Sequence, residues 1–288
     1  QHFNETGLFL RFSQRGFNGA AGLADVPVTF DYPGQFLAPA PDRILFHDKH
    51  IMSVWDGVSP TVTNLFTADA ELSEIAPGSF GHYLVAERFA DPVRGARLIE
   101  FDLNGVVTEH PFPQNIVNGI AVGASHIELL ADHCTLLFTT GDDDPHGNRV
   151  RRMNICTNQP EPDFATLVGG FYAGSIRQLP NGDVLVANGD PIFRFNLAGS
   201  MVDTYHLPGV KLIALADDAA TFWAVTVDAN RQLTFLHELP LDARLPSRAV
   251  LIDSPGSSNF LLVDVTQLVV VSEWRAAVDH RVRAIRRR

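Results

Sequence analysis

Apolar residues recur along the chain in short runs of about 5 to 8 positions, and Gly, Pro, Asn and Asp separate one run from the next. Three such runs are "CTLLFTT" (134–140), "DVLVAN" (183–188) and "FWAVTVD" (222–228). A period of 3.6 residues, the mark of an amphipathic helix, is nearly absent. The pattern therefore predicts an all-β fold, which leaves a sandwich, a barrel or a propeller.

An internal repeat decides among these three. "GHYLVAE" (81–87) resembles "GDVLVAN" (182–188), and "LIEFDLNGVVTEH" (98–110) resembles "IFRFNLAGSMVDTYH" (192–206). Phe101 and Phe195 occupy equivalent places with one further unit between them, so the period is about 47 residues. Four strands in roughly 45 residues are typical of a β-propeller blade.

With this period, 288 residues hold six blades. We expect one domain over 1–288, with blades at about 35–67, 72–113, 116–168, 171–208, 210–252 and 257–288. The last unit lacks one strand, and the N-terminal segment 1–34 has strands to spare at 7–13 or 26–31. An N-terminal strand that completes the final blade would close the ring and remove an exposed sheet edge. Seven blades would need about 41 residues each, which the spacing does not favour.

The chain has two cysteines, Cys134 and Cys156, one at each end of a predicted hairpin. Their midpoint is residue 145, and the turn "GDDDPHGN" (141–148) is centred between 144 and 145. Symmetric pairing would place the cysteines opposite each other, with Leu137 opposite Met153 and Thr135 opposite Ile155. We expect a disulfide in an oxidising compartment, which means a secreted, extracellular or periplasmic protein; two opposed free thiols are the alternative.

The net charge of −11 argues against nucleic acid or an anionic membrane as the partner, because both favour a basic surface. No uninterrupted apolar run approaches the roughly 18 residues of a membrane helix. The partners that remain are a small molecule, a glycan or a surface protein.

The segment "IELLADHCTLLFTTG…RVRRMNICTNQPEPDFATL…SIRQLPNGDVLVANGDPIFRFNLAGSMVDTY" (127–205) resembles the NHL-like and SMP-30-type, gluconolactonase-like propellers of secreted bacterial proteins. The resemblance covers about two units clearly and implies a propeller. The enzyme branch of that group implies a divalent metal, often calcium, on the propeller axis. "NGIA" (118–121) is similar to a ligand-bearing phrase of the group, which makes Asn118 a candidate ligand.

Each predicted second strand ends near a polar residue, and these ends share one face of a propeller. The six residues are Asp48, Glu87, Thr140, Asn188, Asp228 and Glu273. Carboxylate and amide oxygens suit a hard cation such as calcium, so the candidate metal ligands are Asn118, Glu87, Asn188 and Asp228. The alternative is turn chemistry, since Asp and Asn also favour tight connections.

Two functions follow as hypotheses. No metal-binding or nucleophilic motif such as HExxH or G-x-S-x-G is present, which favours a binding module that acts through the loop-bearing face. The alternative is a calcium-dependent, lactonase-like hydrolase in which the metal polarises a carbonyl. An assembly unit is a third hypothesis.

Overall fold

The computed structural model of the protein describes residues 8–13, 23–30, 36–40, 43–55, 62–141, 144–167, 173–187, 189–215, 220–228, 233–242, 248–253, 268–269 and 284–285. Nearly all regular structure in these ranges is β-strand. In the same ranges, no helix has the length and apolarity that crossing a membrane requires. The predicted all-β class is therefore confirmed.

The described strands form five four-stranded antiparallel sheets, each built from consecutive strands. The first sheet contains β3 (Phe36–Ala40), β4 (Arg43–Asp48), β5 (Ile51–Trp55) and β6 (Thr63–Thr67). The second contains β7 (Glu71–Pro77), β8 (Tyr83–Ala90), β9 (Arg97–Asp102) and β10 (Gly105–Pro111). The third contains β13 (His126–Leu129), β14 (Thr135–Thr139), β15 (Arg149–Asn154) and β16 (Gln159–Thr166).

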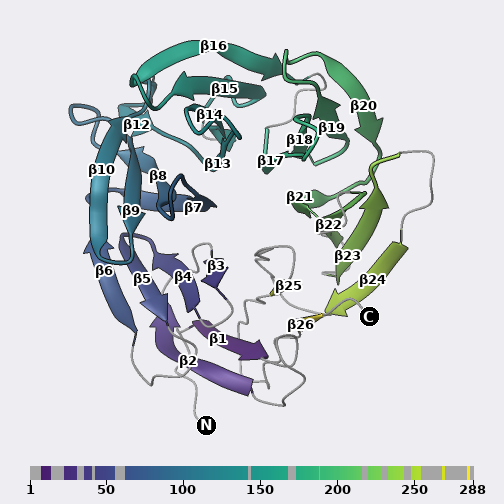
Figure 1. The fold of residues 1–288 in the computed structure, drawn as a ribbon, viewed down its shortest axis with the longest axis horizontal. Helices are drawn as coiled ribbons and strands as arrows, with labels where there is room; N and C mark the ends of the chain where they lie inside the picture. Colours follow the sequence, from purple (N-terminus) through teal and green to yellow (C-terminus); the bar gives the residue numbers. More distant parts are fainter. Residues whose placement is uncertain are drawn as a thin grey trace.

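The fourth sheet contains β17 (Ile176–Gln178), β18 (Val184–Ala187), β19 (Ile192–Phe195) and β20 (Met201–Tyr205). The fifth contains β21 (Val210–Leu215), β22 (Thr221–Asp228), β23 (Leu233–Pro240) and β24 (Arg248–Asp253). Figure 1 shows the five sheets arranged as blades around a centre, with β3, β7, β13, β17 and β21 innermost and β6, β10, β16, β20 and β24 outermost. This arrangement is a β-propeller, as the repeat predicted.

The second strand of each blade explains why the apolar runs are so continuous. In β18, Val184 and Val186 pack toward the third blade, whereas Leu185 and Ala187 pack toward the fifth. Successive side chains of a strand point to opposite faces of its sheet, and here another blade covers each face. A strand that is buried on both faces has no polar side, so its sequence does not alternate.

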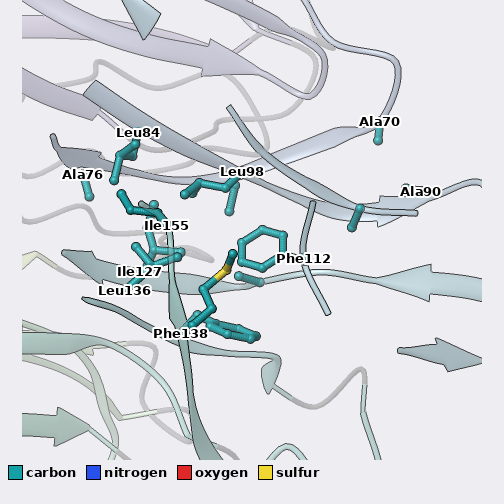
Figure 2. Close-up of a cluster of buried hydrophobic side chains, with 14 of the residues drawn as sticks. Ala70, Ala76, Leu84, Ala90, Leu98, Phe112, Ile127, Leu136, Phe138 and Ile155 are labelled. Atoms are coloured by element: carbon teal, nitrogen blue, oxygen red, sulfur yellow. The ribbon is translucent and has the colours of Figure 1, made fainter. Parts of the chain in front are cut away.

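The cores lie between blades. Figure 2 shows the core between blades two and three, where Leu84 and Leu98 of the second blade meet Leu136 and Phe138 of the third. The Phe112 ring lies 5.0 Å from the Phe138 ring, measured between centroids. Each of these side chains is at most 7 % exposed, and burial of one such side chain stabilises by roughly 1.5–3 kcal/mol.

One hairpin departs from the predicted boundaries. β11 (Ile116–Val117) pairs with β12 (Ile120–Val122), and β12 pairs with β8 through Ala121 opposite Ala90. The segment 116–122 therefore extends the second sheet, although we had placed it at the start of the third unit. The physical reason is that β8 continues past the point where β9 begins, which leaves one side of residues 89–90 open for another strand.

The Cys134–Cys156 disulfide is present, with the two Cα atoms 5.2 Å apart. The predicted register is wrong by one residue, because Met153 lies opposite Leu136 and Asn154 lies opposite Thr135. The ladder is centred on the turn, between residues 144 and 145, and not on the midpoint of the cysteines. The disulfide joins the two chains just beyond the last ladder pair, where the backbone is already turning at His133 (φ 58°).

The predicted sixth blade is described only in part. β25 (Leu268–Val269) pairs with β26 (Ala284–Ile285), and β1 (Leu8–Ser13) pairs with β2 (Leu23–Phe30). Figure 1 places both pairs in the sector between the first and fifth blades. The described residues thus make five complete blades where the period predicted six. No pairing joins β1 or β2 to β25 or β26 among these residues, and most of 257–288 lies outside them.

Candidate functional site at the propeller axis

The inner strand of each blade is a sheet edge, so half of its backbone N–H groups have no partner in the ladder. Carboxylates from the preceding blade supply partners for two of them. Glu74 on β7 accepts a hydrogen bond from the Ile127 N–H of β13 at 2.7 Å. Glu128 on β13 accepts one from the Gln178 N–H of β17 at 2.8 Å. Three consecutive inner strands are therefore linked by side chains on the axial side of the ring.

Arg177 connects these links across the third blade. Its Nη2 donates to Glu74 Oε1 at 2.9 Å, and its Nη1 lies 3.8 Å from Glu128 Oε2. Arg177 belongs to the fourth blade and Glu74 to the second, so the guanidinium reaches Glu74 along the axial edge of β13. The side chain of Glu74 is 1 % exposed and that of Arg177 is 22 % exposed.

His126 is the fourth member of the group. Its Nδ1 lies 3.3 Å from Glu74 Oε2, and the Nδ1 atom itself is buried. The His126 side chain is 18 % exposed, so the exposed part lies elsewhere on the ring. We call Glu74, His126, Glu128 and Arg177 the axial cluster.

The two carboxyls of the axial cluster are in opposite electrostatic situations. Burial by itself would raise the pKa of Glu74, but the Arg177 guanidinium, His126 and the Ile127 N–H together hold this pKa below its usual value. Burial raises the pKa of Glu128 to about 7, and the charge of Glu74 adds to the rise, whereas Arg177 and the Gln178 N–H oppose it. Glu74 is therefore ionised at neutral pH, whereas Glu128 exchanges its proton near pH 7.

The hydrogen-bonding capacity of the axial cluster is only partly used. Guanidinium has five N–H donors, and the Arg177 hydrogen bonds found in the described part of the chain use one to Glu74 and one to the Ile176 carbonyl. Glu128 Oε2 has no hydrogen bond there, only the 3.8 Å approach of Arg177. The cluster thus combines spare donors with a carboxyl that can either donate or accept.

Two of the predicted metal ligands have other roles in the described structure. Glu87 is 1 % exposed and accepts hydrogen bonds from Arg94 Nη2 at 2.7 Å and from the Arg97 N–H at 2.9 Å. Asn118 is exposed in the two-residue turn between β11 and β12, where its φ is 51° and that of Gly119 is 79°. An Asn-Gly pair with two positive φ angles is the favoured turn for such a hairpin. The structure does not bring Glu87 and Asn118 together.

The remaining predicted ligands are not described well enough to be placed. Asn188 and Glu273 lie outside the described residues, and the side chains of Asp228 and Asp48 are likewise not described. Thr140 is buried and donates to Asp144 Oδ2 at 3.2 Å. Within the described ranges, no group of three or more His, Cys, Asp or Glu side chains is arranged to hold a metal ion. The calcium site remains a prediction.

The acidic turn "GDDDPHGN" has one residue with a structural role. Asp144 is 3 % exposed and accepts hydrogen bonds from Asn115 Nδ2 at 2.8 Å and from the His146 N–H at 2.9 Å. It therefore ties the turn of the third blade to the segment that leads into β11. Asp142 and Asp143 lie outside the described residues.

The sequence analysis missed the axial cluster. A signal was present, because "HIEL" (126–129) and "SIRQL" (175–179) place charged residues inside strands that the repeat assigns to the innermost position. Polar side chains there need partners on the axis, and only the closure of the ring shows which residues those are.

The comparisons with known proteins were made at three levels. No protein-family model matches the chain, and no curated protein matches it. Among solved structures, the chain is similar to virginiamycin B lyase from Staphylococcus aureus, with a TM-score of 0.60 and 15 % identity over 88 % of this chain and 84 % of that chain. It is also similar to a protein of unknown function from Bacteroides caccae, with a TM-score of 0.59 and 16 % identity over 86 % of this chain and 94 % of that one.

A third similar structure is a chain of the mitotic checkpoint complex, with a TM-score of 0.58 and 10 % identity over 94 % of this chain and 90 % of that chain. Identities this low reflect shared architecture and not shared chemistry. The resemblance to NHL-like and SMP-30-type proteins is not confirmed by these matches. What they establish is the fold, and the chain is a β-propeller.

Proposed function

We propose that the protein is a binding module that holds a small polar ligand at the propeller axis, in an oxidising compartment. The observation that carries this proposal is the position of Arg177, which reaches from the fourth blade to Glu74 of the second. Capping of the inner-strand N–H groups explains the two carboxylates without any ligand. It does not explain a guanidinium and an imidazole that are gathered on the same side of β13.

The energetic cost of the axial cluster supports the proposal. Removal of a carboxylate and a guanidinium from water costs several kcal/mol for each ion before their attraction offsets it. An apolar pair of similar volume would hold two blades together at least as well. Retention of buried charges on the axis, with unused donors on Arg177, is typical of a site that recognises a polar molecule.

The disulfide supports the expected compartment. Structural disulfides persist in secreted and periplasmic proteins and are rare in the cytosol. The Cys134–Cys156 pair lies at the end of a hairpin, and Cys156 is exposed. A reducing cytosol would have access to it. We therefore place the protein, as part of the proposal, outside the cytosol.

The test is a binding screen on the intact, oxidised protein. Sugars, hydroxy acids and lactones, each at millimolar concentration, are screened by thermal shift, and hits are confirmed by calorimetry. The proposal expects at least one hit whose affinity falls tenfold or more in Arg177→Gln. The matched control is Arg149→Gln, which breaks the outer-strand ion pair with Asp163 and should leave the affinity unchanged. No hit in any class, or equal losses in both variants, would overturn the proposal.

Metal analysis of the same preparation tests the calcium-dependent alternative. A stoichiometric cation that chelation removes, together with a fall in melting temperature, would favour the hydrolase with a metal on the axis. A metal-free protein whose melting temperature is unchanged by chelation would exclude that form of it.

A further inference from the structure

Glu74 and His126 are arranged as a carboxylate–imidazole pair. A carboxylate 3.3 Å from Nδ1 favours the neutral tautomer with its proton on Nδ1, and this tautomer leaves Nε2 as a proton acceptor. Arg177 and the Ile127 N–H hold Glu74 in place and ionised. Such bonds are often long before substrate binds and shorten in the complex. His126 is therefore set up as a base, with Glu74 as its positioning residue.

Glu128 is set up as an acid on the same strand. It follows His126 by two residues, so both side chains leave β13 on the same face, with Cα atoms about 7 Å apart. That separation leaves room for a water molecule and a scissile bond between a base and an acid. Burial raises the pKa of Glu128 to about 7, so a large fraction of the group carries a proton at neutral pH.

Arg177 decides which kind of bond fits this pair. Its Nη1 lies 3.8 Å from Glu128 Oε2, and three of its five N–H donors have no hydrogen bond among the described residues. A fixed cation stabilises negative charge that develops on an acyl oxygen, whereas it opposes the positive charge of a glycosyl transition state. The cluster therefore fits an ester and not a glycoside.

We propose that the axial cluster hydrolyses an ester or lactone bond, with His126 as general base, Glu128 as general acid and Arg177 stabilising the oxyanion. This inference rests on the proposed function, because the same cluster must first bind the ligand. It needs no metal ion. It differs in this respect from the calcium-dependent hydrolase considered above.

The reaction balances with water as the co-reactant. Nε2 of His126 takes a proton from water while the water oxygen bonds to the carbonyl carbon, and the C=O electron pair moves to the oxygen beside Arg177. When C=O re-forms, the bond to the alkoxy oxygen breaks and Glu128 protonates that oxygen. An ester gives an acid and an alcohol, and a lactone gives a hydroxy acid. His126 loses its extra proton to solvent, and Glu128 regains one.

The experiment uses the intact, oxidised protein with p-nitrophenyl butyrate and dihydrocoumarin as probes, in buffer that contains EDTA. We expect hydrolysis of at least one probe, with kcat/KM passing through a maximum near neutral pH. His126→Gln and Glu128→Gln should each lower kcat/KM by about 100-fold or more. His126→Gln should remove the acidic limb of the pH profile, and Glu128→Gln should remove the basic limb. His206→Gln, which changes a histidine whose side chain is 79 % exposed, should have no effect.

Glu74→Gln tests the positioning role. It should lower kcat more than it raises KM and should shift the acidic limb of the pH profile, which a purely structural role would not do. Circular dichroism establishes that each variant is folded. No hydrolysis of either probe by the wild type, full activity in His126→Gln or Glu128→Gln, or loss of activity in EDTA would overturn the inference. If ligands bind in the screen above but no probe is hydrolysed, the inference fails and the binding function stands; if nothing binds, both fail.

Discussion

The Glu74 carboxylate on β7 accepts the backbone N–H of Ile127 on β13 at 2.7 Å, and this bond joins the inner edges of the second and third blades. The same carboxylate holds Arg177 of the fourth blade at 2.9 Å. One side chain thus connects three blades that lie far apart in the sequence. The interaction caps a sheet edge and at the same time fixes the charges of the axial cluster.

Glu74→Gln is expected to destabilise the protein. The amide keeps the shape of the side chain, but it leaves the Arg177 guanidinium without its ionised partner. Loss of one member of a buried pair costs roughly 2–4 kcal/mol when the other member is partly solvated. Urea denaturation at pH 7 gives the free energy of unfolding. The control is Glu161→Gln, which breaks the more exposed pair with Arg152 and should cost less than about 1 kcal/mol. Equal costs would contradict the role given to Glu74.

Glu128 makes stability depend on pH in a defined direction. Its pKa in the folded protein is about 7, compared with 4.5 for an ordinary Glu, so the folded state binds the proton more tightly. The resulting stabilisation is complete below about pH 4.5 and is lost as the pH rises toward 7. The whole effect amounts to roughly 3 kcal/mol at most.

Glu128→Gln should remove this loss. We expect the free energy of unfolding of the wild type to fall, relative to that of the variant, between pH 5 and pH 8. Glu74, whose pKa is lowered, contributes with the opposite sign and in a more acidic range in both proteins, so the difference between them isolates Glu128. Identical pH profiles for the two proteins would show that Glu128 is not buried in its neutral form.

The disulfide should contribute measurably to stability. Cys134 and Cys156 are separated by 22 positions, and closure of a loop of that size stabilises by about 3 kcal/mol in the chain-entropy account. Because Cys156 is exposed, a phosphine reductant can reach the bond. We expect reduction to lower the melting temperature of the wild type and to leave that of a Cys134→Ser/Cys156→Ser variant unchanged. Equal melting temperatures for reduced and oxidised wild type would contradict the stabilising role.

Gly199 should tolerate no side chain. Its φ is 76°, and a Cβ built there would lie 2.0 Å from the Phe164 carbonyl oxygen of the third blade. Gly189 is the matched control, since its φ is 81° and no atom lies within 4 Å of the same construction. Gly189→Ala should cost about 1 kcal/mol for the backbone conformation alone, whereas Gly199→Ala should cost at least about 2 kcal/mol more. Urea denaturation of both variants gives the two costs, and similar values would show that the two blades can separate.

Local chemistry was enough to predict the strands and the repeat. The runs around Leu136 and Leu185 are apolar throughout because a blade covers each face of their strands, and Phe101 and Phe195 mark the period because each unit fills the same space. The disulfide followed from the same hairpin geometry. Its register was one residue off, since the turn and not the cysteines centres the ladder.

The axial cluster and the sector between the first and fifth blades depend on tertiary structure. Glu74 and Arg177 are 103 residues apart in the chain, and their contact exists only because the ring brings the inner strands to one axis. No local pattern distinguishes Glu87, which Arg94 holds within its own blade, from Glu74, which serves three blades. The sequence by itself determined strands, repeat and cross-link, because these depend on neighbours within one unit. The closed ring decided which charges meet, because it alone sets the distances between units.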